Sequence, residues 1–448
     1  MKFQIILLAF LFLGCNTTQE KQIAQSENPE AHMAELADVY FSKLTGLEDF
    51  NGVVLLKKND EIILNKAYTM SSDTTSTLFI TKNSQFDLRS LAKLFAKISI
   101  IDLEAEGKLL REDTLSKYLP DFPNAKTITI EQLMSNTSGL PRTFEESDRP
   151  YIELGREDVL ELAATSKLEF EPGTEERYSN VGFQLIYYTI GEATGTSFES
   201  YINQHCFEPL GMRNTGSHFF TGKDRKTQYA FGHYRSNDKT IVCECVLPSD
   251  DMQMGNLFST AHDMNKFMSQ LDKQTYADLI HDGSISHAGG TRGKRAYVER
   301  NFDDDYSIIF LANYDDIPFE KIVADMQRIV KGDSIVLPKA VLRKSTEIPS
   351  EVLKQYEGTY DLIDAGHIIL TIKFENDSLY VYQKGKNNGV IYPESERVFF
   401  GDKTSEESIE FIKNDNGQFD MLIDFQGVQW KGTRLQNNKG ADKAVEKN

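Results

Sequence analysis

The chain has 448 residues, 40% hydrophobic and 26% charged, which is enough for roughly two or three domains with ample cores. Its formal net charge is -19, and it has no basic patch of the kind that nucleic acid requires, so we expect no nucleic-acid partner. The four cysteines do not indicate a disulfide framework. Cys243 and Cys245 share a face of a strand-like run but lack the further ligands that a metal site needs, and we predict no metal and no cofactor.

The N-terminus is patterned as an export signal. The apolar run Ile5–Leu13 is too short to span a bilayer and has the shape of a signal-peptide core. Gly14 directly precedes Cys15, and this arrangement resembles the signal of bacterial lipoproteins, in which the cysteine becomes lipidated. We therefore predict a signal peptide over residues 1–15, lipidation of Cys15, a flexible tether over residues 16–28, and a lipid anchor in a membrane of the bacterial cell envelope.

The next part of the chain reads as strands, many helices, strands and a helix. An amphipathic helix ends near Gly46, and two strands then flank an Asn59–Asp60 turn. Helical segments follow, one of them opened by a capping box at Thr129. Strand patterns return in "SISHAGGTRGKRAYVER" and "DYSIIFLANYD", before an amphipathic helix that ends at Gly332. This order predicts one antiparallel sheet with a helical lobe inserted between its first and last strands, in an α+β fold.

In the C-terminal part of the chain, the spacing of the apolar residues changes. Residues 332–349 look like a linker, and beyond them apolar residues alternate with a period of two between polar turns. Strands at this spacing predict a small antiparallel barrel or sandwich over residues 350–436. The polar residues 437–448 read as a disordered tail.

Ser90 and Lys93 form a polar pair at the start of an otherwise apolar helix. Their spacing of three places them on one helical face, about one turn apart. A serine there is often only a helix cap, and a lysine on a helix is usually solvated. The other Ser-x-x-Lys match, Ser236 to Lys239, lies in a polar turn without a helical pattern, and we give it no role.

Further candidates lie far along the chain. A serine hydroxyl becomes a nucleophile only with a base within hydrogen-bond reach and with donors for the oxyanion that forms. Tyr178 and Asn180 stand in "RYSN", a loop leading into a helix. His287 precedes Gly289 and Gly290, which allow a close backbone approach. Taken singly, the tyrosine is more simply a packed loop residue and the histidine a surface or capped residue.

In the order "SLAK", "YSN", "HAG", the three motifs resemble those of the serine β-lactamase and penicillin-binding-protein superfamily. They are most similar to the branch of class C β-lactamases, D-alanyl-D-alanine carboxypeptidases and serine esterases. The resemblance extends over about residues 35–330. It implies a β-lactamase-like fold over residues 29–331, with an antiparallel sheet flanked by helices and a helical lobe, and a barrel-like domain of a kind often appended in this branch.

The resemblance also implies a role for each motif residue. Ser90 would be the acylated nucleophile, and Lys93 would take its proton or hold the base in its active state. Tyr178 would relay protons to the leaving group and from the deacylating water. Asn180 would orient the lysine and the substrate amide, and His287 would stand where penicillin-binding relatives place a lysine.

Backbone groups would complete the site. The oxyanion hole would consist of the N–H groups of Ser90 and Gly290, and Gly289 would bind substrate beside them. The helix N-terminus would add positive field at the forming oxyanion. The chain would then be a membrane-tethered serine hydrolase acting through an acyl-enzyme on an ester, amide, D-amino-acid peptide or β-lactam bond. Its partner would be a small-molecule or peptide substrate, and the sequence leaves its oligomeric state open.

Three departures from the pattern of these relatives weaken this interpretation, and the shortened stretch before His287 is the main support for an alternative function. Arg89 precedes the serine where many relatives have a small residue, and Arg292 and Lys294 place positive charge at the rim of the expected site. Only about 20 residues separate Phe267 from His287, where relatives usually carry a longer stretch. The alternative is a catalytically weak or inactive binding protein that holds a cell-wall peptide in the same pocket.

Overall fold

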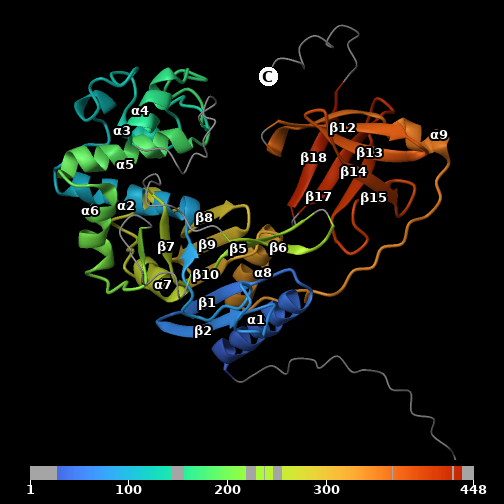
Figure 1. Ribbon diagram of the computed structural model, residues 1–448, viewed down its shortest axis with the longest axis horizontal. Coiled ribbons are helices and arrows are strands. Elements are labelled where there is room, and N and C mark those ends of the chain that lie inside the picture. The colour runs from blue at the N-terminus through green and yellow to red at the C-terminus, as the bar shows by residue number, and fades with distance from the viewer. Residues whose placement is uncertain are drawn as a thin grey trace, which may run out of the picture.

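The computed structural model describes residues 28–143, 156–217, 229–236, 238–245, 255–365, 367–425 and 428–435. The predicted signal peptide, Cys15 and the predicted tail lie outside these residues, as does the predicted tether except for Asn28. A sheet-centred domain and a β-barrel form two bodies, joined by an extended segment that runs along one side of the molecule (Figure 1). None of the described helices is long and apolar enough to cross a membrane.

A five-stranded antiparallel sheet forms the centre of the larger domain, in the order β2-β1-β10-β9-β8. Its strands are β1 (Gly52–Lys58), β2 (Glu61–Tyr68), β8 (Ser284–Thr291), β9 (Lys294–Asn301) and β10 (Tyr306–Ala312). The sheet thus joins strands from the two ends of the domain, with the helical lobe between them in sequence, and the predicted β-lactamase-like α+β arrangement is confirmed. Strand β8 forms one edge of the sheet.

Each face of the sheet packs against its own layer of helices. α1 (Pro29–Gly46) and α8 (Phe319–Lys331) share one hydrophobic core with Val54 and Leu56 of β1. The intervening Val53 and Leu55 belong to a second core with the helices of the lobe. Successive strand side chains point to opposite faces, so the fully apolar run in β1 serves both cores.

The lobe is built from short helices and small sheets. Its helices are α2 (Ala92–Ala105), α3 (Ile130–Met134), α4 (Arg156–Thr165), α5 (Asn180–Thr194), α6 (Phe198–Ile202) and α7 (Ala261–Ser269). The short strands are β3 (Phe86–Asp87), β4 (Gly216–Ser217), β5 (Gly232–Arg235), β6 (Ile241–Glu244) and β7 (Leu257–Ser259). The predicted capping box is present, because Thr129 accepts from the N–H of Gln132 and the Gln132 side chain accepts from that of Thr129.

The C-terminal body is a closed barrel, which settles the choice between barrel and sandwich. After α9 (Ser350–Leu353), its strands are β11 (Gly358–Leu362), β12 (Ile368–Glu375), β13 (Ser378–Gln383), β14 (Lys386–Pro393), β15 (Val398–Phe400), β16 (Ser408–Lys413), β17 (Phe419–Phe425) and β18 (Val428–Arg434). Pairing of β11 with β18 closes it. Aromatic rings fill its core, where Tyr356 stacks on Phe411 with centroids 4.2 Å apart.

One cysteine expectation is wrong. Cys243 and Cys245 form a disulfide in the structure, although the sequence pattern indicates none. Residues two apart in an extended strand are separated by about 6.5 Å, whereas these two Cα atoms are 5.2 Å apart, within the usual disulfide range. Strand β6 ends at Glu244, so Cys245 leaves the strand and the shared face that the sequence pattern implies does not form.

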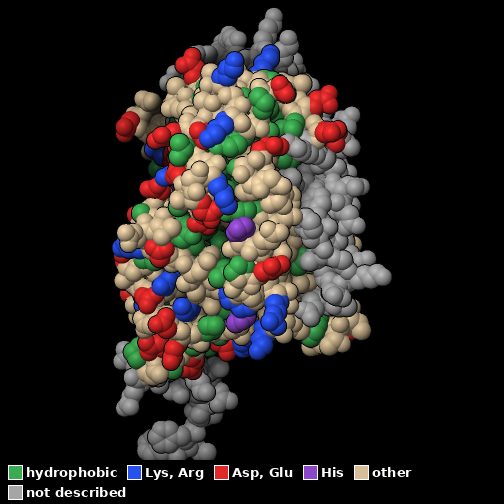
Figure 2. Space-filling view, turned by 90° about the vertical axis from the view of Figure 1, so that its left-hand side faces the viewer, with side chains coloured by type: hydrophobic (Ala, Val, Ile, Leu, Met, Phe, Trp, Pro, Cys, Tyr) green, Lys and Arg blue, Asp and Glu red, His purple; other side chains and the backbone are tan. Residues whose placement is uncertain are grey.

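On the face of the molecule in Figure 2, acidic and basic side chains are interspersed.

Candidate active site

Ser90 lies in a 3₁₀ turn, Arg89–Leu91, between β3 and the first residue of α2. β3 pairs with β7, and the N–H of Leu88 donates to the carbonyl oxygen of Leu257 at 2.9 Å, so the entry to the turn is fixed. Arg89 has a φ of 52°, in the left-handed region that non-glycine residues rarely adopt. Strained backbone of this kind is found at functional sites, and here it presents a half-buried serine at the start of a helix.

The Ser90 hydroxyl has two side-chain partners. Lys93 Nζ donates to Ser90 Oγ at 3.2 Å, and the Tyr178 hydroxyl donates to the same oxygen at 2.8 Å. Tyr178 is 88 residues from the serine in sequence. The structure therefore brings together the three residues expected to be catalytic, with both protic groups in contact with the expected nucleophile.

Lys93 is buried where an ammonium is disfavoured. Its exposed fraction is 7%, and Nζ lies 5.2 Å from the centroid of the Tyr178 ring and 5.5 Å from that of Phe183. Burial, followed by the positive charges of Arg89 and Arg142, lowers the pKa of Lys93 to about 7. A large fraction of this amine is then neutral near neutral pH, and a neutral amine accepts the proton of a serine.

The pKa of Tyr178 is shifted in the opposite direction from that of Lys93. Burial raises the pKa of its phenol, while the hydrogen bond to Ser90 and the charge of Arg142 oppose the rise. The phenol therefore stays protonated near neutral pH and is a proton donor in the resting site. Of the two partners of Ser90, the amine is the better base and the phenol the better relay.

The loop that carries Tyr178 is held by the neighbouring turn. Ser179 caps α5, because its hydroxyl accepts from the N–H of Gly182 at 2.9 Å and donates to the carbonyl oxygen of Pro141 at 2.7 Å. Asn180 is the half-buried first residue of α5, and its N–H donates to the carbonyl oxygen of Arg142 at 3.0 Å. The cap thus places Tyr178 and Asn180 at the end of α5 nearest the site.

Edge strand β8 lies directly against the Ser90 turn. A Cβ added at Gly289 would lie 2.2 Å from the carbonyl oxygen of Leu88, closer than real side chains come, so only glycine fits. His287, two residues earlier, shares this face of β8, while Gly290 is exposed on the other face. Three of the four predicted substrate-binding residues, His287, Gly289 and Gly290, therefore lie along the edge strand that borders the nucleophile turn, and the fourth, Asn180, lies at the start of α5.

His287 differs chemically from the lysine expected in penicillin-binding relatives. Its Nδ1 contacts the carbonyl oxygen of Ala288 at 2.8 Å, and a carbonyl can only accept, so Nδ1 carries the proton. Burial of the half-buried ring lowers its pKa to about 4, and the nearby charges of Lys93 and Lys97 add to this. The ring is therefore neutral near neutral pH and does not supply the positive charge that a lysine would.

A buried ion pair beneath the site was missed by sequence reasoning. The expectation that Lys294 charges the rim is wrong, because Lys294 is 9% exposed and its Nζ pairs with the Asp87 carboxylate and donates to the Tyr229 hydroxyl at 2.9 Å. The Tyr229 hydroxyl also donates to Asp87 at 2.7 Å. The pair joins β3, three residues before Ser90, to β9. The one signal available in sequence was the carboxylate inside the apolar "FDL" stretch.

The arrangement supports hydrolysis by side chains of the protein itself. It combines a hydroxyl at a helix start, a largely neutral amine, a protonated phenol and an adjacent edge strand, which together suit nucleophilic attack on a carbonyl carbon. Across the described ranges of the chain, no group of three or more His, Cys, Asp or Glu side chains is placed to hold a metal ion.

Comparison with known proteins agrees with this geometry. The model of the Beta-lactamase family matches residues 43–283, which end just before β8. The chain is 26% identical to penicillin-binding protein 4* of Bacillus subtilis over 459 residues, which cover 92% of this chain and 100% of that protein.

Two solved structures share the fold at 18% sequence identity, and the likeness at this level concerns the fold alone. An octameric penicillin-binding protein homologue from Pyrococcus abyssi has a TM-score of 0.57, covering 89% of this chain and 99% of that one. The D-amino acid amidase of Ochrobactrum anthropi, complexed with L-phenylalanine, has a TM-score of 0.56 and covers 66% of this chain and 98% of that one.

Proposed function

The chain belongs to the β-lactamase family, whose members are serine hydrolases, and we propose that it hydrolyses an ester, amide, D-amino-acid peptide or β-lactam bond through an acyl-enzyme on Ser90. The observation that carries the proposal is the contact of Ser90 Oγ with both Lys93 Nζ and the Tyr178 hydroxyl. A solvated lysine or a simple cap would not produce this cluster, because Lys93 is buried and its pKa is lowered toward neutrality.

In the proposed acylation step, neutral Lys93 accepts the hydroxyl proton while Ser90 Oγ bonds to the substrate carbonyl carbon. The oxyanion that forms is held by the N–H groups of Ser90 and Gly290, next to the start of α2. The tetrahedral intermediate collapses as Tyr178 passes a proton to the leaving group, and Lys93 reprotonates the phenol. Asn180 orients the substrate amide in this scheme.

Deacylation reverses the roles. A water molecule gives a proton to the Tyr178–Lys93 pair and its oxygen attacks the acyl carbon. The bond to Ser90 Oγ then breaks, the serine regains a proton, and a carboxylic acid leaves. The two groups that carry the protons in this scheme, Lys93 Nζ and the Tyr178 hydroxyl, each contact Ser90 Oγ in the structure, and the scheme uses no cofactor.

We propose β-lactam-like or D-amino-acid-containing substrates for this chain. The proposal is supported by the similarity to penicillin-binding protein 4* and by the fold shared with the D-amino acid amidase. We place the protein in the bacterial cell envelope, anchored to a membrane through lipidated Cys15, on the strength of the Ile5–Leu13 run and the Gly14–Cys15 pair. The substrate is then a small molecule or peptide of the envelope.

The alternative, a weak or inactive protein that binds cell-wall peptide, is favoured by one observation. A neutral His287 stands where penicillin-binding relatives place a lysine, and this would weaken binding of an anionic substrate at the site. The short stretch between Phe267 and His287 favours the same alternative.

Covalent labelling tests the proposal. Wild type and Ser90→Ala are incubated with a fluorophosphonate or with benzylpenicillin, and intact mass is measured. We expect one adduct on wild type and none on the variant. Labelling that survives in Ser90→Ala would overturn the assignment of the nucleophile, and a folded wild type that never labels would favour the binding protein.

A further inference from the structure

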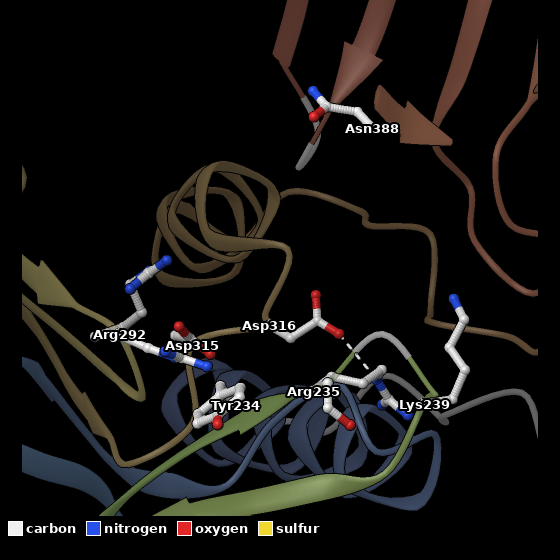
Figure 3. A pocket seen from close by; sticks show the side chains of 9 residues that line it. Tyr234, Arg235, Lys239, Arg292, Asp315, Asp316 and Asn388 are labelled. Carbon is white, nitrogen blue, oxygen red and sulfur yellow. Dashed lines mark hydrogen bonds and ion pairs between the residues drawn. The ribbon is translucent and has the colours of Figure 1, made fainter. Parts of the chain in front are cut away.

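A cavity of about 770 Å³ lies between the sheet domain and the barrel, and the proposed chemistry does not use it. Its walls come from β5, the turn between β8 and β9, the loop after β10, and Asn388 of β14 (Figure 3). The figure shows Arg292 and Asp315 at one end, the Arg235–Asp316 ion pair beside them, and Asn388 of the barrel on the opposite side.

The cavity is positively charged in an acidic protein. Four cationic and two anionic side chains line it, in a chain whose formal net charge is -19. Two of the cations have carboxylate partners, since Arg235 Nε lies 2.9 Å from an oxygen of Asp316 and Lys239 pairs with Asp402 of the barrel. The other two cations are Arg292 and Arg295.

Arg292 is held in place but keeps its donors available. Its guanidinium carbon lies 3.6 Å from the centroid of the Tyr234 ring, a stacking contact that fixes the plane of the group. Within the described part of the chain, its guanidinium makes no hydrogen bond or ion pair besides this stacking contact. A planar guanidinium with free N–H groups, already ordered on an aromatic ring, is suited to binding a carboxylate or a phosphate.

Arg295 is a partly desolvated cation beside it. Among the described residues, the partners of its Nη1 are carbonyl oxygens, those of Thr291 at 2.8 Å and Lys294 at 2.9 Å. Burial lowers the pKa of this guanidinium, and the more distant charges of Asp315 and Asp316 only partly offset the effect. An anion in the cavity would supply the missing counter-charge.

We propose that this interdomain cavity binds a carboxylate or phosphate group through Arg292 and Arg295, with Asn388 of the barrel closing it on the opposite side. The group has two conceivable sources. It is either a separate small anion, or an acidic part of a substrate bound at Ser90. The second source requires a substrate that extends around edge strand β8, because Arg295 lies against Gly290, on the face of β8 opposite to Gly289 and the Ser90 turn.

Anion binding is tested on the full chain carrying Ser90→Ala, which removes turnover. Inorganic pyrophosphate and citrate are titrated calorimetrically. We expect saturable binding of at least one of them, weakened about tenfold or more by Arg292→Ala, because a charge-assisted hydrogen bond is lost. Asp315→Asn should tighten binding, because it removes a like charge from the cavity. Lys108→Ala removes a surface cation paired with Glu106, away from the cavity, and should leave binding unchanged.

Opposite shifts for Arg292→Ala and Asp315→Asn support the site. Absence of saturable binding of both probes, or equal weakening by Arg292→Ala and Lys108→Ala, overturns it. Kinetics of the active chain then identify the source. If the anion belongs to the substrate, Arg292→Ala raises KM for a carboxylated ester at least fivefold more than for its neutral analogue, and pyrophosphate competes with the ester. If the anion is a separate molecule, Arg292→Ala changes KM for the carboxylated ester and for its neutral analogue by the same factor. If neither ester is hydrolysed, the ester activity within the proposed function fails while the calorimetric result stands.

Discussion

At the scale of single residues, the candidate site depends on a lysine that is buried among positive charges. Lys93 has Arg89 and Arg142 as its electrostatic neighbours, and its partner in contact is the neutral Ser90 hydroxyl. A charged lysine is costly in such a place, and this cost is what makes the neutral amine available as a base. The left-handed Arg89 both presents the serine and contributes to lowering the pKa of the lysine.

The pH dependence of turnover follows from this. The neutral fraction of Lys93 grows as pH rises through its pKa of about 7, so we expect kcat/KM for a p-nitrophenyl ester to rise with pH with a midpoint near that value. Lys93→Met should lower kcat/KM by about 10²–10⁴-fold and remove the rise. His287→Asn should keep the midpoint, because the pKa of His287 is about 4. A midpoint near 4, or one that survives in Lys93→Met, would assign the base to another group.

At the scale of elements, the site depends on close packing of the Ser90 turn against strand β8. Gly289 permits this packing, because it has no side chain where the carbonyl oxygen of Leu88 lies. Gly289→Ala places a methyl group 2.2 Å from this oxygen, so β8 has to move away from the turn. Displacements of about 1 Å at a catalytic site cost about 10²-fold in rate, and we expect a loss of this order in kcat/KM.

The matched control is Gly401→Ala, at a position with no atom within 4 Å of the added Cβ. It should leave kcat/KM and the melting temperature close to those of wild type. The Gly289 variant is expected to lose activity with a smaller effect on folding, because β8 is an edge strand that pairs with β9 on one side only. Activity of Gly289→Ala equal to that of Gly401→Ala would show that the close approach is not needed for turnover.

The Asp87–Lys294 ion pair joins β3, which leads into the Ser90 turn, to β9, the strand that pairs with β8. Removing one partner of a buried ion pair leaves an uncompensated charge and costs about 3–5 kcal/mol. We therefore expect Lys294→Met and Asp87→Asn each to lower the free energy of unfolding in denaturant titrations by an amount of this order. The double variant has no unpaired charge and should be more stable than either single variant. Additive losses in the double variant would show that the two side chains stabilise the fold independently.

How well a contact could be predicted from the sequence depends mainly on how close together its residues lie in the chain. The Ser90–Lys93 contact can be read from a spacing of three on a helix, and the split sheet and a C-terminal antiparallel barrel or sandwich from strand periods. Lys294 could not be placed in this way, because its burial depends on a carboxylate 207 residues away. The Cys243–Cys245 disulfide depends on where β6 ends, and strand ends are poorly marked by periodicity.

At the scale of the whole molecule, the two bodies meet around a charged contact rather than a continuous core. Lys239 of the sheet domain pairs with Asp402 of the barrel, while the aromatic core of the barrel is separate from the two cores of the sheet domain. The segment between Gly332 and Pro349 contains no helix or strand. The barrel is thus positioned to form one wall of the interdomain cavity without being part of the folding core around Ser90.

The proposed lipid anchor would determine whether the protein is attached to a membrane. The Ile5–Leu13 run is too short to span a bilayer, so attachment through the N-terminal segment would need the lipid on Cys15. We expect Cys15→Ser to move the protein from the membrane fraction to the soluble fraction, or to leave an unprocessed precursor, as seen by fractionation and intact mass of the product. Cys206→Ser is the control, because Cys206 is the described cysteine that is not in a disulfide. An equal membrane fraction in wild type and Cys15→Ser would exclude lipidation of Cys15 as the anchor.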